Sequence, residues 1–196
     1  VTGALSYGGL ERVVINLATY MNRDIFEPMV VCMHNRGELA SEVESHGVEV
    51  IALNEHHKRV KGYLGFLTLR QLIKKLEIDI INTHNTGPLI DGVLASRVTG
   101  VKGIIHTDHA RRWPDKKRYV LAERIAARFV NTIIAVSEET KQSLVKYEGI
   151  DEQKIRVIIN GIAKEKYCIS VERDGTLERL GIRGFDLYVG LGVVLT

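Results

Sequence analysis

Two short polar segments contain histidines, and each segment follows a run of residues of the kind that form buried strands. One is Asn82-Thr83-His84-Asn85 and the other is His106-Thr107-Asp108-His109. Ligands of a parallel α/β sheet bind at the carboxyl ends of its strands, so we expect both segments at one edge of a sheet. Side chains alternate along a strand, and the last residue of a run emerges at the rim. His109 is therefore the better candidate for a catalytic residue, although a lone histidine is more often structural.

Metal binding is the competing interpretation of the second segment, because two histidines and an aspartate are ligands that metal ions use. In adjacent strand positions, however, the side chains of His106, Asp108 and His109 diverge, which works against a shared ion. We therefore expect neither a metal nor another cofactor at this edge.

A different kind of site is indicated near the start of the chain by Ser6-Tyr7-Gly8-Gly9-Leu10-Glu11-Arg12. Here a first strand would lead into a first helix, and the free N–H groups of a helix start attract an anion such as phosphate. Paired glycines let a ligand approach the backbone closely. The spacing differs from G-x-G-x-x-G, which argues against a dinucleotide-binding dehydrogenase. A glycine turn before an ordinary helix is the alternative.

Basic charge is concentrated in residues 56–66 and 111–119, which are both expected after strands on the ligand-binding side of the sheet. The first segment has three Lys or Arg and no acid, and the second has five against one Asp. They carry +3 and +4, whereas the whole chain carries only +3, so the remainder carries −4. Both segments also contain aromatic residues. This combination suits an anionic substrate or an acidic membrane surface, with a solvated loop as the alternative.

Short β-branched runs alternate with segments of helical period, which predicts repeated βα units around a doubly wound parallel sheet. The expected strands are Met29–Met33, Val48–Leu53, Ile78–Thr83, Gly103–Thr107, Thr132–Val136 and Ile155–Ile159. The expected helices are Leu10–Met21, Glu38–His46, Gly62–Leu76, Leu89–Val98, Asp115–Phe129 and Glu138–Tyr147. Ser137 is a predicted helix N-cap. Residues Val1–Gly3 are expected to end a strand whose earlier part lies upstream of the sequence.

Composition limits the class of protein. The 196 residues are 45% hydrophobic and 26% charged, which is typical of a soluble globular chain, and no apolar run reaches the length of a membrane-spanning helix. Cys32 and Cys168 lie far apart without zinc-ligand spacing, which favours a reducing compartment. We expect a Rossmann-like domain over 1–161, a linker over 162–186, and the first strand of a second domain over 187–196.

Five segments taken together resemble the N-terminal domain of the retaining nucleotide-sugar glycosyltransferases of GT-B fold, specifically family 4, also called group 1. The matching segments are Gly8–Ala18, Ile78–Asn85, His106–His109, Ile134–Glu138 and Val157–Ile162. The resemblance implies an enzyme with two Rossmann-like halves, of which this chain would be the acceptor-side half. The nucleotide-sugar pocket of the C-terminal half would be absent, so the chain alone is expected to be inactive.

The resemblance also implies roles for individual residues. Gly8 and Gly9 correspond to the loop that meets the diphosphate of the donor, and His109 to the histidine that approaches the transferred sugar. Asn160 and Gly161 correspond to the start of the interdomain hinge. The positions at which family members carry acceptor-binding elements are occupied by His84, Asn85, Lys58, Arg59, Arg111 and Arg112.

The implied partners are a C-terminal domain, a nucleotide-sugar donor, and a sugar, lipid-linked or phosphorylated acceptor, but no nucleic acid. We expect a cytoplasmic enzyme, and an anionic or lipid-linked acceptor would place it at the inner face of the membrane. Two alternatives remain open from the sequence. One is a nucleotide-sugar epimerase of the same fold, and the other is a non-catalytic Rossmann-like binding module, although residues 2–6 lack the acids that a receiver domain needs.

Overall fold

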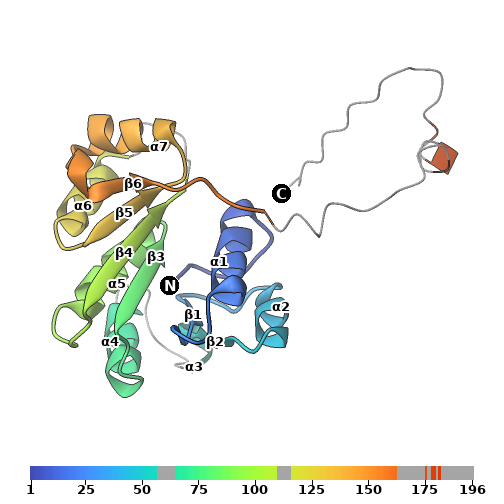
Figure 1. The fold of residues 1–196 in the computed structure, drawn as a ribbon. Helices are drawn as coiled ribbons and strands as arrows, with labels where there is room; N and C mark the ends of the chain where they lie inside the picture. Colours follow the sequence, from blue (N-terminus) through green and yellow to red (C-terminus); the bar gives the residue numbers. More distant parts are fainter. Residues whose placement is uncertain (57–64, 110–115, 163–174, 176–177, 180, 182–196) are drawn as a thin grey trace. The chain divides into compact units, whose positions relative to one another are not determined.

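A computed structural model of the chain describes residues 1–56, 65–109 and 116–162, together with Gly175, Glu178, Arg179 and Gly181. The chain divides into two compact units, Val1–Gly161 and Ile162–Thr196. In the first unit, helices alternate with strands along the chain (Figure 1). The expected segments Lys58–Arg59, Arg111–Arg112 and 187–196 lie outside the described residues.

The strands are β1 (Met29–Cys32), β2 (Glu49–Ala52), β3 (Ile80–His84), β4 (Gly103–Asp108), β5 (Thr132–Ala135) and β6 (Ile155–Val157). The helices are α1 (Gly9–Tyr20), α2 (Ala40–Ser45), α3 (Leu53–His56), α4 (Gly65–Lys75), α5 (Thr86–Ser96), α6 (Lys117–Ala127) and α7 (Glu138–Ser143). A π-helical turn, η2 (Leu144–Glu148), continues α7, and a 3-10 turn, η3 (Glu152–Lys154), precedes β6.

All strand pairs described are parallel, with β1 beside β2 and the order β3-β4-β5-β6 in a second group. Residues Val1 and Thr2 lie between the groups. Thr2 forms a parallel bridge to Cys32, and the backbone N–H of His84 donates to the carbonyl of Val1 at 3.0 Å. The start of the chain therefore joins β1 to β3, which gives the strand order of a doubly wound, Rossmann-like sheet.

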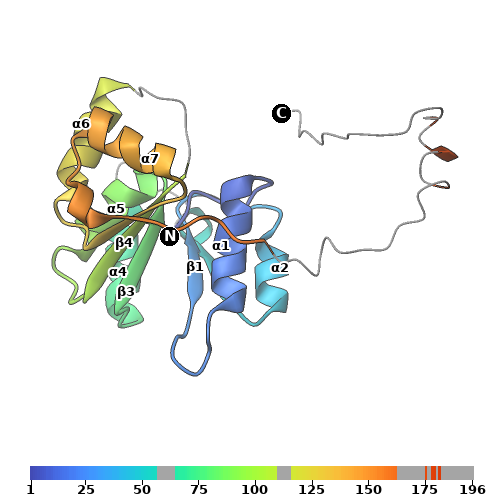
Figure 2. The same ribbon diagram turned by 45° about the horizontal axis from the view of Figure 1, so that its top comes forward.

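Apolar side chains bury both faces of this sheet. Helices α1 and α2 pack over β1 and β2 through Val14, Ile15 and Val43, whereas α5, α6 and η2 cover β4, β5 and β6. Figures 1 and 2 both show α1 and α2 side by side, away from α6 and α7. Nearly continuous apolar strands such as Met29–Cys32 are what a parallel sheet covered on both faces requires.

The predicted alternation of strands and helices is confirmed, with differences at the boundaries. Helix α5 begins at Thr86, three residues before the expected start, and the expected helix over Glu138–Tyr147 changes to a π-helical turn at Leu144. The predicted N-cap is confirmed, because the Ser137 hydroxyl accepts from the N–H of Thr140 at 3.1 Å. Gly149 ends the π-helical turn in the left-handed region, at φ +64°.

The end of the strand expected over Val48–Leu53 was also predicted wrongly. Leu53 was expected to end a strand, but it begins the short helix α3 instead. The last pair in the register of β1 and β2 is Cys32 with Ala52, so the strand has no partner beyond that point. The buried Leu53 side chain then packs with Val31, Leu69 and Ile73.

The turn before α2 holds the loop that leads to Gly8. Gly37 has φ +76°, and its neighbour Leu39 donates its backbone N–H to the carbonyl of Leu5 at 2.9 Å. A Cβ atom at Gly37 would overlap the backbone of Leu5, whose nitrogen would lie only 2.7 Å away. Glycine is therefore required here both for its conformation and for space.

We predict that Gly37→Ala lowers the free energy of unfolding by about 3 kcal/mol, because backbone strain and a steric clash combine. Gly47 has φ +71° but no atom within 4 Å of a Cβ position, so Gly47→Ala should cost only about 1 kcal/mol. Urea denaturation of the two variants measures the difference. Equal losses would show that the Leu5 contact does not constrain the turn.

Candidate functional site

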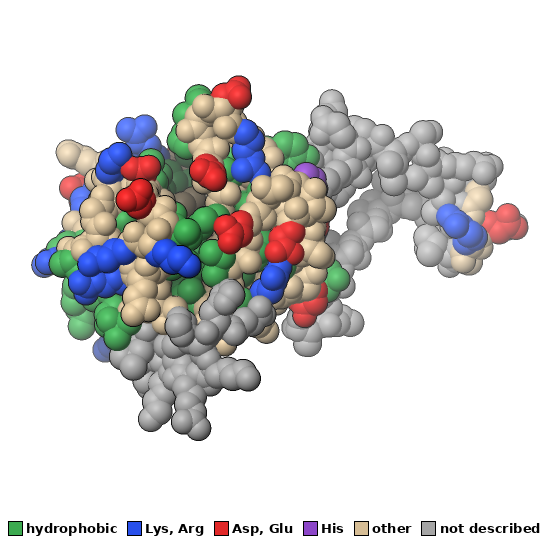
Figure 3. All heavy atoms as spheres, turned by 90° about the horizontal axis from the view of Figure 1, so that it is seen from below, with side chains coloured by type: hydrophobic (Ala, Val, Ile, Leu, Met, Phe, Trp, Pro, Cys, Tyr) green, Lys and Arg blue, Asp and Glu red, His purple; other side chains and the backbone are tan. Residues whose placement is uncertain are grey.

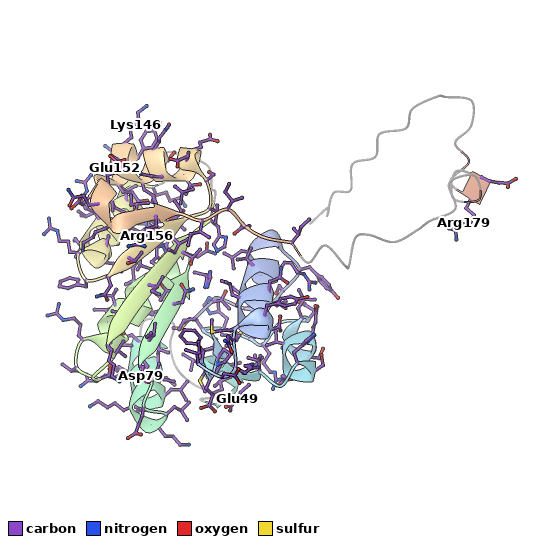
Figure 4. The ribbon with its side chains drawn as sticks, viewed as in Figure 1. Glu49, Asp79, Lys146, Glu152, Arg156 and Arg179 are labelled. Atoms are coloured by element: carbon purple, nitrogen blue, oxygen red, sulfur yellow. The ribbon has the colours of Figure 1, made fainter. Side chains whose placement is uncertain are left out.

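The carboxyl ends of the central strands carry the polar residues of the candidate site. Val1–Thr2 leads into the loop that contains Gly8, while β3 ends at His84 and β4 at Asp108, immediately before His109. Because the strands are parallel, these segments leave the sheet at the same edge. Asp79, labelled in Figure 4, precedes β3 at the opposite edge, where it pairs with Lys102 at 2.6 Å.

Two of the expected site residues are brought into direct contact. Nδ1 of His84 lies 3.1 Å from Nε2 of His109, and the ring centroids are 5.4 Å apart with the planes tilted by 32°. His84 is buried, with 3% of its surface exposed, whereas His109 is half-buried at the end of β4. The sequence predicted both residues at one edge but did not predict that they touch.

Both histidines of this pair are held in the neutral form. Burial lowers the pKa of His84 well below its usual value, and the nearby His109 adds to that effect. Burial also lowers the pKa of His109, although the carboxylate of Asp108 opposes the shift. A neutral imidazole can donate one hydrogen bond and accept another, so the pair is suited to orienting polar groups near pH 7.

His106 is buried within the sheet, and its hydrogen bonds to Thr83 give it a structural role. Its Nδ1 donates to the carbonyl of Thr83 at 3.1 Å and lies 3.0 Å from the Thr83 hydroxyl oxygen. A carbonyl only accepts, so Nδ1 carries the proton and Nε2 faces Asp108 Oδ2 at 3.8 Å. Alternation along β4 thus separates the anchored His106 from the half-buried His109, as the sequence predicted.

Asn85 adopts an unusual backbone conformation at the point where β3 leads into α5. Its φ of +70° and ψ of +163° lie in a region that is essentially restricted to glycine. Such strain costs of order 1–3 kcal/mol and is concentrated at functional sites. No signal in the sequence marked this conformation, since asparagine is tolerated in many turns.

The N-terminus of α1 is open at the paired glycines. Gly8 is the N-cap residue, no side chain caps the helix, and both Gly8 and Gly9 are exposed. A Cβ atom at Gly9 would meet nothing within 4 Å, whereas one at Gly8 would collide with the carboxylate of Glu11. A carboxylate folded against the helix start is what the helix dipole favours, so this end of α1 attracts negative charge.

Asp108, which directly precedes His109, belongs to a cluster of three buried carboxylates. Oxygen atoms of Asp108, Glu123 and Glu148 come within 4.8 Å of one another, and each side chain is at most 4% exposed. The Thr86 hydroxyl donates to Glu123, and each of the three residues has further interactions. Within the described part of the chain, this is the group of side chains whose chemistry suits a metal ion.

Sequence reasoning missed Glu123 and Glu148 as buried residues. Helical periodicity offers a signal for the first, since Glu123 lies three and four residues before the buried Ala126 and Ala127 of α6. Glu148 ends the π-helical turn, and the packing of that turn against α6 decides its burial. Arg124 ties the two elements together, because its Nε donates to the backbone carbonyl of Glu148.

The remaining predicted residues fall into two groups. Asn160 and Gly161 are exposed and are the last residues of the first compact unit, and their hinge role stays a prediction. Lys58, Arg59, Arg111 and Arg112 lie outside the described residues, so their acceptor-binding role also stays a prediction.

Comparison with known proteins gives one family. Residues 7–166 match the family described as Glycosyltransferase Family 4. A curated relative from Escherichia coli, "UDP-Gal:alpha-D-GlcNAc-diphosphoundecaprenol alpha-1,3-galactosyltransferase", is 26% identical over 180 residues, which cover 88% of this chain and 46% of that protein. The resemblance predicted from five short segments is confirmed.

Solved structures agree on the fold. A glycosyltransferase from Rickettsia africae superposes with a TM-score of 0.73 at 25% identity, covering 94% of this chain and 48% of that one. Anabaena HepE in complex with UDP and glucose gives a TM-score of 0.72 at 21% identity, covering 92% and 50%. The chain therefore has a GT-B type Rossmann-like fold, and it spans about half the length of the proteins it matches.

We predict that Asn85→Gly raises the free energy of unfolding by about 1 kcal/mol, because glycine adopts the positive-φ conformation without strain. Asn85→Ala should lower the same quantity by about 1 kcal/mol, since alanine lacks the tolerance of asparagine for this conformation. Urea denaturation of both variants measures the pair. A destabilised glycine variant would mean that the Asn85 side chain, rather than the backbone, determines the turn.

Proposed function

The chain belongs to glycosyltransferase family 4, and from this premise we propose that it is the N-terminal, acceptor-side half of a retaining nucleotide-sugar glycosyltransferase. The observation that carries the proposal is the neutral His84–His109 pair at the carboxyl edge of a sheet in a family 4 domain. The nucleotide-sugar pocket would lie in a C-terminal half joined at Asn160–Gly161.

The leaving diphosphate would bind at the N-terminus of α1. Gly8 and Gly9 are both exposed there, with open space beside Gly9, and the helix dipole stabilises negative charge without a metal ion. Anabaena HepE, which shares the fold, was crystallised with UDP and glucose. Support for the donor assignment therefore comes from the open glycine loop and from a structural relative that binds such a nucleotide.

His109 would hold the transferred sugar by a hydrogen bond. Its lowered pKa keeps the imidazole neutral near pH 7, so it acts through hydrogen bonding and not through a fixed positive charge. The half-buried position at the end of β4 lets one side of the ring face solvent or substrate. We propose that His109 orients the sugar and helps manage protons, and we assign it no role as a nucleophile.

The acceptor is proposed to be anionic or lipid-linked. The E. coli relative is named for a diphosphoundecaprenol acceptor, a lipid carrying two phosphates. The basic residues Lys58, Arg59, Arg111 and Arg112 and the polar Asn85 are the proposed acceptor contacts. Such an acceptor implies an enzyme that works at the cytoplasmic face of a membrane. None of the described helices has the length and hydropathy to cross a membrane.

The surface that we propose for such peripheral binding is on α6. Leu121 and Ile125 of α6, together with Phe129 just beyond its end, form an exposed stripe at spacings of four residues. Exposed basic residues accompany the stripe, namely Lys117, Arg118, Arg124 and Arg128. The only acid of α6, Glu123, is buried. An apolar stripe flanked by cations is typical of helices that lie on anionic membranes.

The neighbouring helix α5 extends this α6 surface. Leu94 on α5 and Val98 just after it are exposed, and the guanidinium of Arg97, the C-cap residue of α5, lies 4.5 Å from the centroid of the Phe129 ring. By contrast, the face turned to the viewer in Figure 3 shows acidic and basic side chains interspersed. The combination of apolar and purely basic exposed groups on α6 supports an anionic lipid surface as its partner.

We predict that His109→Ala in the full-length enzyme lowers kcat by at least about 100-fold and leaves the affinity for nucleotide nearly unchanged, because the donor nucleotide is bound elsewhere. Radiolabelled sugar transfer and calorimetric titration with nucleotide measure the two quantities. Unchanged turnover would remove His109 from the mechanism.

Two controls accompany this measurement. The 196-residue chain alone should transfer no sugar, since the donor pocket would be missing, and robust transfer by it would contradict the assignment as an acceptor-side half. Incubation of the full-length enzyme with donor but no acceptor should leave the donor sugar unaltered. An epimerised sugar in that reaction would favour the epimerase alternative.

We predict that Ile125→Asp lowers binding of the full-length protein to phosphatidylglycerol vesicles by about tenfold, because losing the burial of one large apolar side chain costs about 1.5 kcal/mol or more. Leu17→Asp on α1 is the matched control, since Leu17 is 43% exposed and Ile125 is 49% exposed. Co-sedimentation should also be weak with neutral phosphatidylcholine vesicles. Equal binding to both lipids, or equal loss in both variants, would contradict membrane docking through α6.

A further inference from the structure

We propose that His84 is a positioning residue for the transfer reaction, and that its ring hydrogen-bonds His109 and thereby sets which nitrogen of His109 faces the sugar. This inference rests on the proposed function and deepens it. It also differs from the sequence-based prediction, in which His84 contacts the acceptor. The two roles give different kinetic results, so they can be separated.

The contact with His84 involves one particular nitrogen of His109. Its Nε2 lies 3.1 Å from Nδ1 of His84, which is hydrogen-bond distance. Among the described residues, no hydrogen bond to Nδ1 of His109 is formed. The imidazole of His109 is thus held at Nε2, and Nδ1 is the nitrogen that remains for a substrate hydroxyl.

The tautomers of the two rings depend on each other, because one hydrogen bond joins them. A single N–H lies between Nδ1 of His84 and Nε2 of His109, because two N–H groups would repel and two lone pairs would form no bond. If His84 donates, His109 carries its proton on Nδ1 and presents a donor to the sugar. If His109 donates, its Nδ1 is unprotonated and presents an acceptor. In either case, the tautomer of His84 determines what His109 offers.

His84 is the more firmly fixed partner. It pairs with Thr107 in the register of β3 and β4, and its backbone N–H donates to Val1 at 3.0 Å. Only 3% of its surface is exposed, so it has almost no area with which to touch an acceptor directly. His109, by contrast, lies one residue beyond the end of β4 and is half-buried. A residue just beyond a strand needs a tether to hold its ring in one orientation.

Neighbouring side chains leave His84 few other partners. His106, the closest histidine on β4, is already bound through Nδ1 to Thr83. Asp108 faces His106 Nε2 at 3.8 Å and belongs to the carboxylate cluster with Glu123 and Glu148. The contact between His84 and His109 is therefore a separate hydrogen-bond unit at the rim, distinct from the buried network behind it.

The test uses three substitutions of His84 in the full-length enzyme. Asparagine places an amide near the position of Nδ1 and keeps a hydrogen bond to His109, whereas glutamine places its amide near Nε2, and leucine has no polar group. We expect His84→Leu and His84→Gln to lower kcat by about 100-fold, as small displacements of positioned groups do. The KM for donor and for acceptor should stay within about twofold, and His84→Asn should restore most of kcat.

A second measurement tests the hydrogen bond between His84 and His109 without an activity assay. Nitrogen-15 NMR of the histidine rings in the 196-residue chain should show one neutral tautomer of His109 in the wild type and in His84→Asn. In His84→Leu and His84→Gln it should show a mixture of tautomers. Thermal unfolding of each variant verifies that the fold is retained. If His84→Leu does not fold, His84→Gln alone provides the comparison with the wild type.

The outcomes separate this inference from the proposed function. A raised KM for the acceptor with unchanged kcat would overturn the positioning role and support an acceptor contact. Unchanged His109 tautomers in His84→Gln would also overturn it. Absence of sugar transfer by the wild-type enzyme would refute the proposed function alone, since the NMR result would still decide whether His84 tethers His109.

Discussion

The parallel pairing of residues 1–2 between β1 and β3 is the constraint on which the rest of the structure depends. Thr2 bridges Cys32 on one side, and Val1 accepts the backbone N–H of His84 on the other. Without this segment, the described strands form two separate groups, β1-β2 and β3-β4-β5-β6. With it, the glycine loop before α1 and the ends of β3 and β4 leave one sheet at the same edge, next to the point where the strand order reverses.

That edge combines an anion-attracting helix end with neutral hydrogen-bonding groups. The start of α1 is uncapped at Gly8 and attracts a carboxylate, while burial keeps the His84–His109 pair uncharged. Stabilisation of a departing diphosphate and orientation of a sugar are chemically different tasks. In the proposed function these tasks fall to different strand ends of the sheet, the first to the start of α1 and the second to the histidine pair.

Polar groups in the interior support this edge. Thr83 and His106 lie in the interior of a sheet otherwise filled with apolar residues, and they hydrogen-bond to each other. Buried polar groups are tolerated only when they are satisfied, so these side chains are fixed in place. The Asn85 backbone adds local strain at the junction with α5. Rigid support of this kind suits a site whose side chains must keep a fixed orientation.

Much of the fold could be predicted from local patterns, because burial on both faces of a parallel sheet selects apolar β-branched runs, and helices need a period of 3.6 residues. The alternation of elements, the Ser137 cap and the placement of His109 at a rim follow from such patterns. Boundaries such as Thr86 and Leu53 did not, since they depend on which partner strand or core cluster is present.

The sequence by itself determined the family, the doubly wound class and the side chains that could perform chemistry at the strand ends. Only the tertiary structure decided that His84 is buried against His109, that Glu123 and Glu148 meet Asp108, and that Asn85 is strained. His84 and His109 are 25 positions apart in the chain, and so are Glu123 and Glu148. Local patterns report which face of an element is buried, but the distance between two side chains depends on register and helix packing, which are set only when the whole sheet assembles.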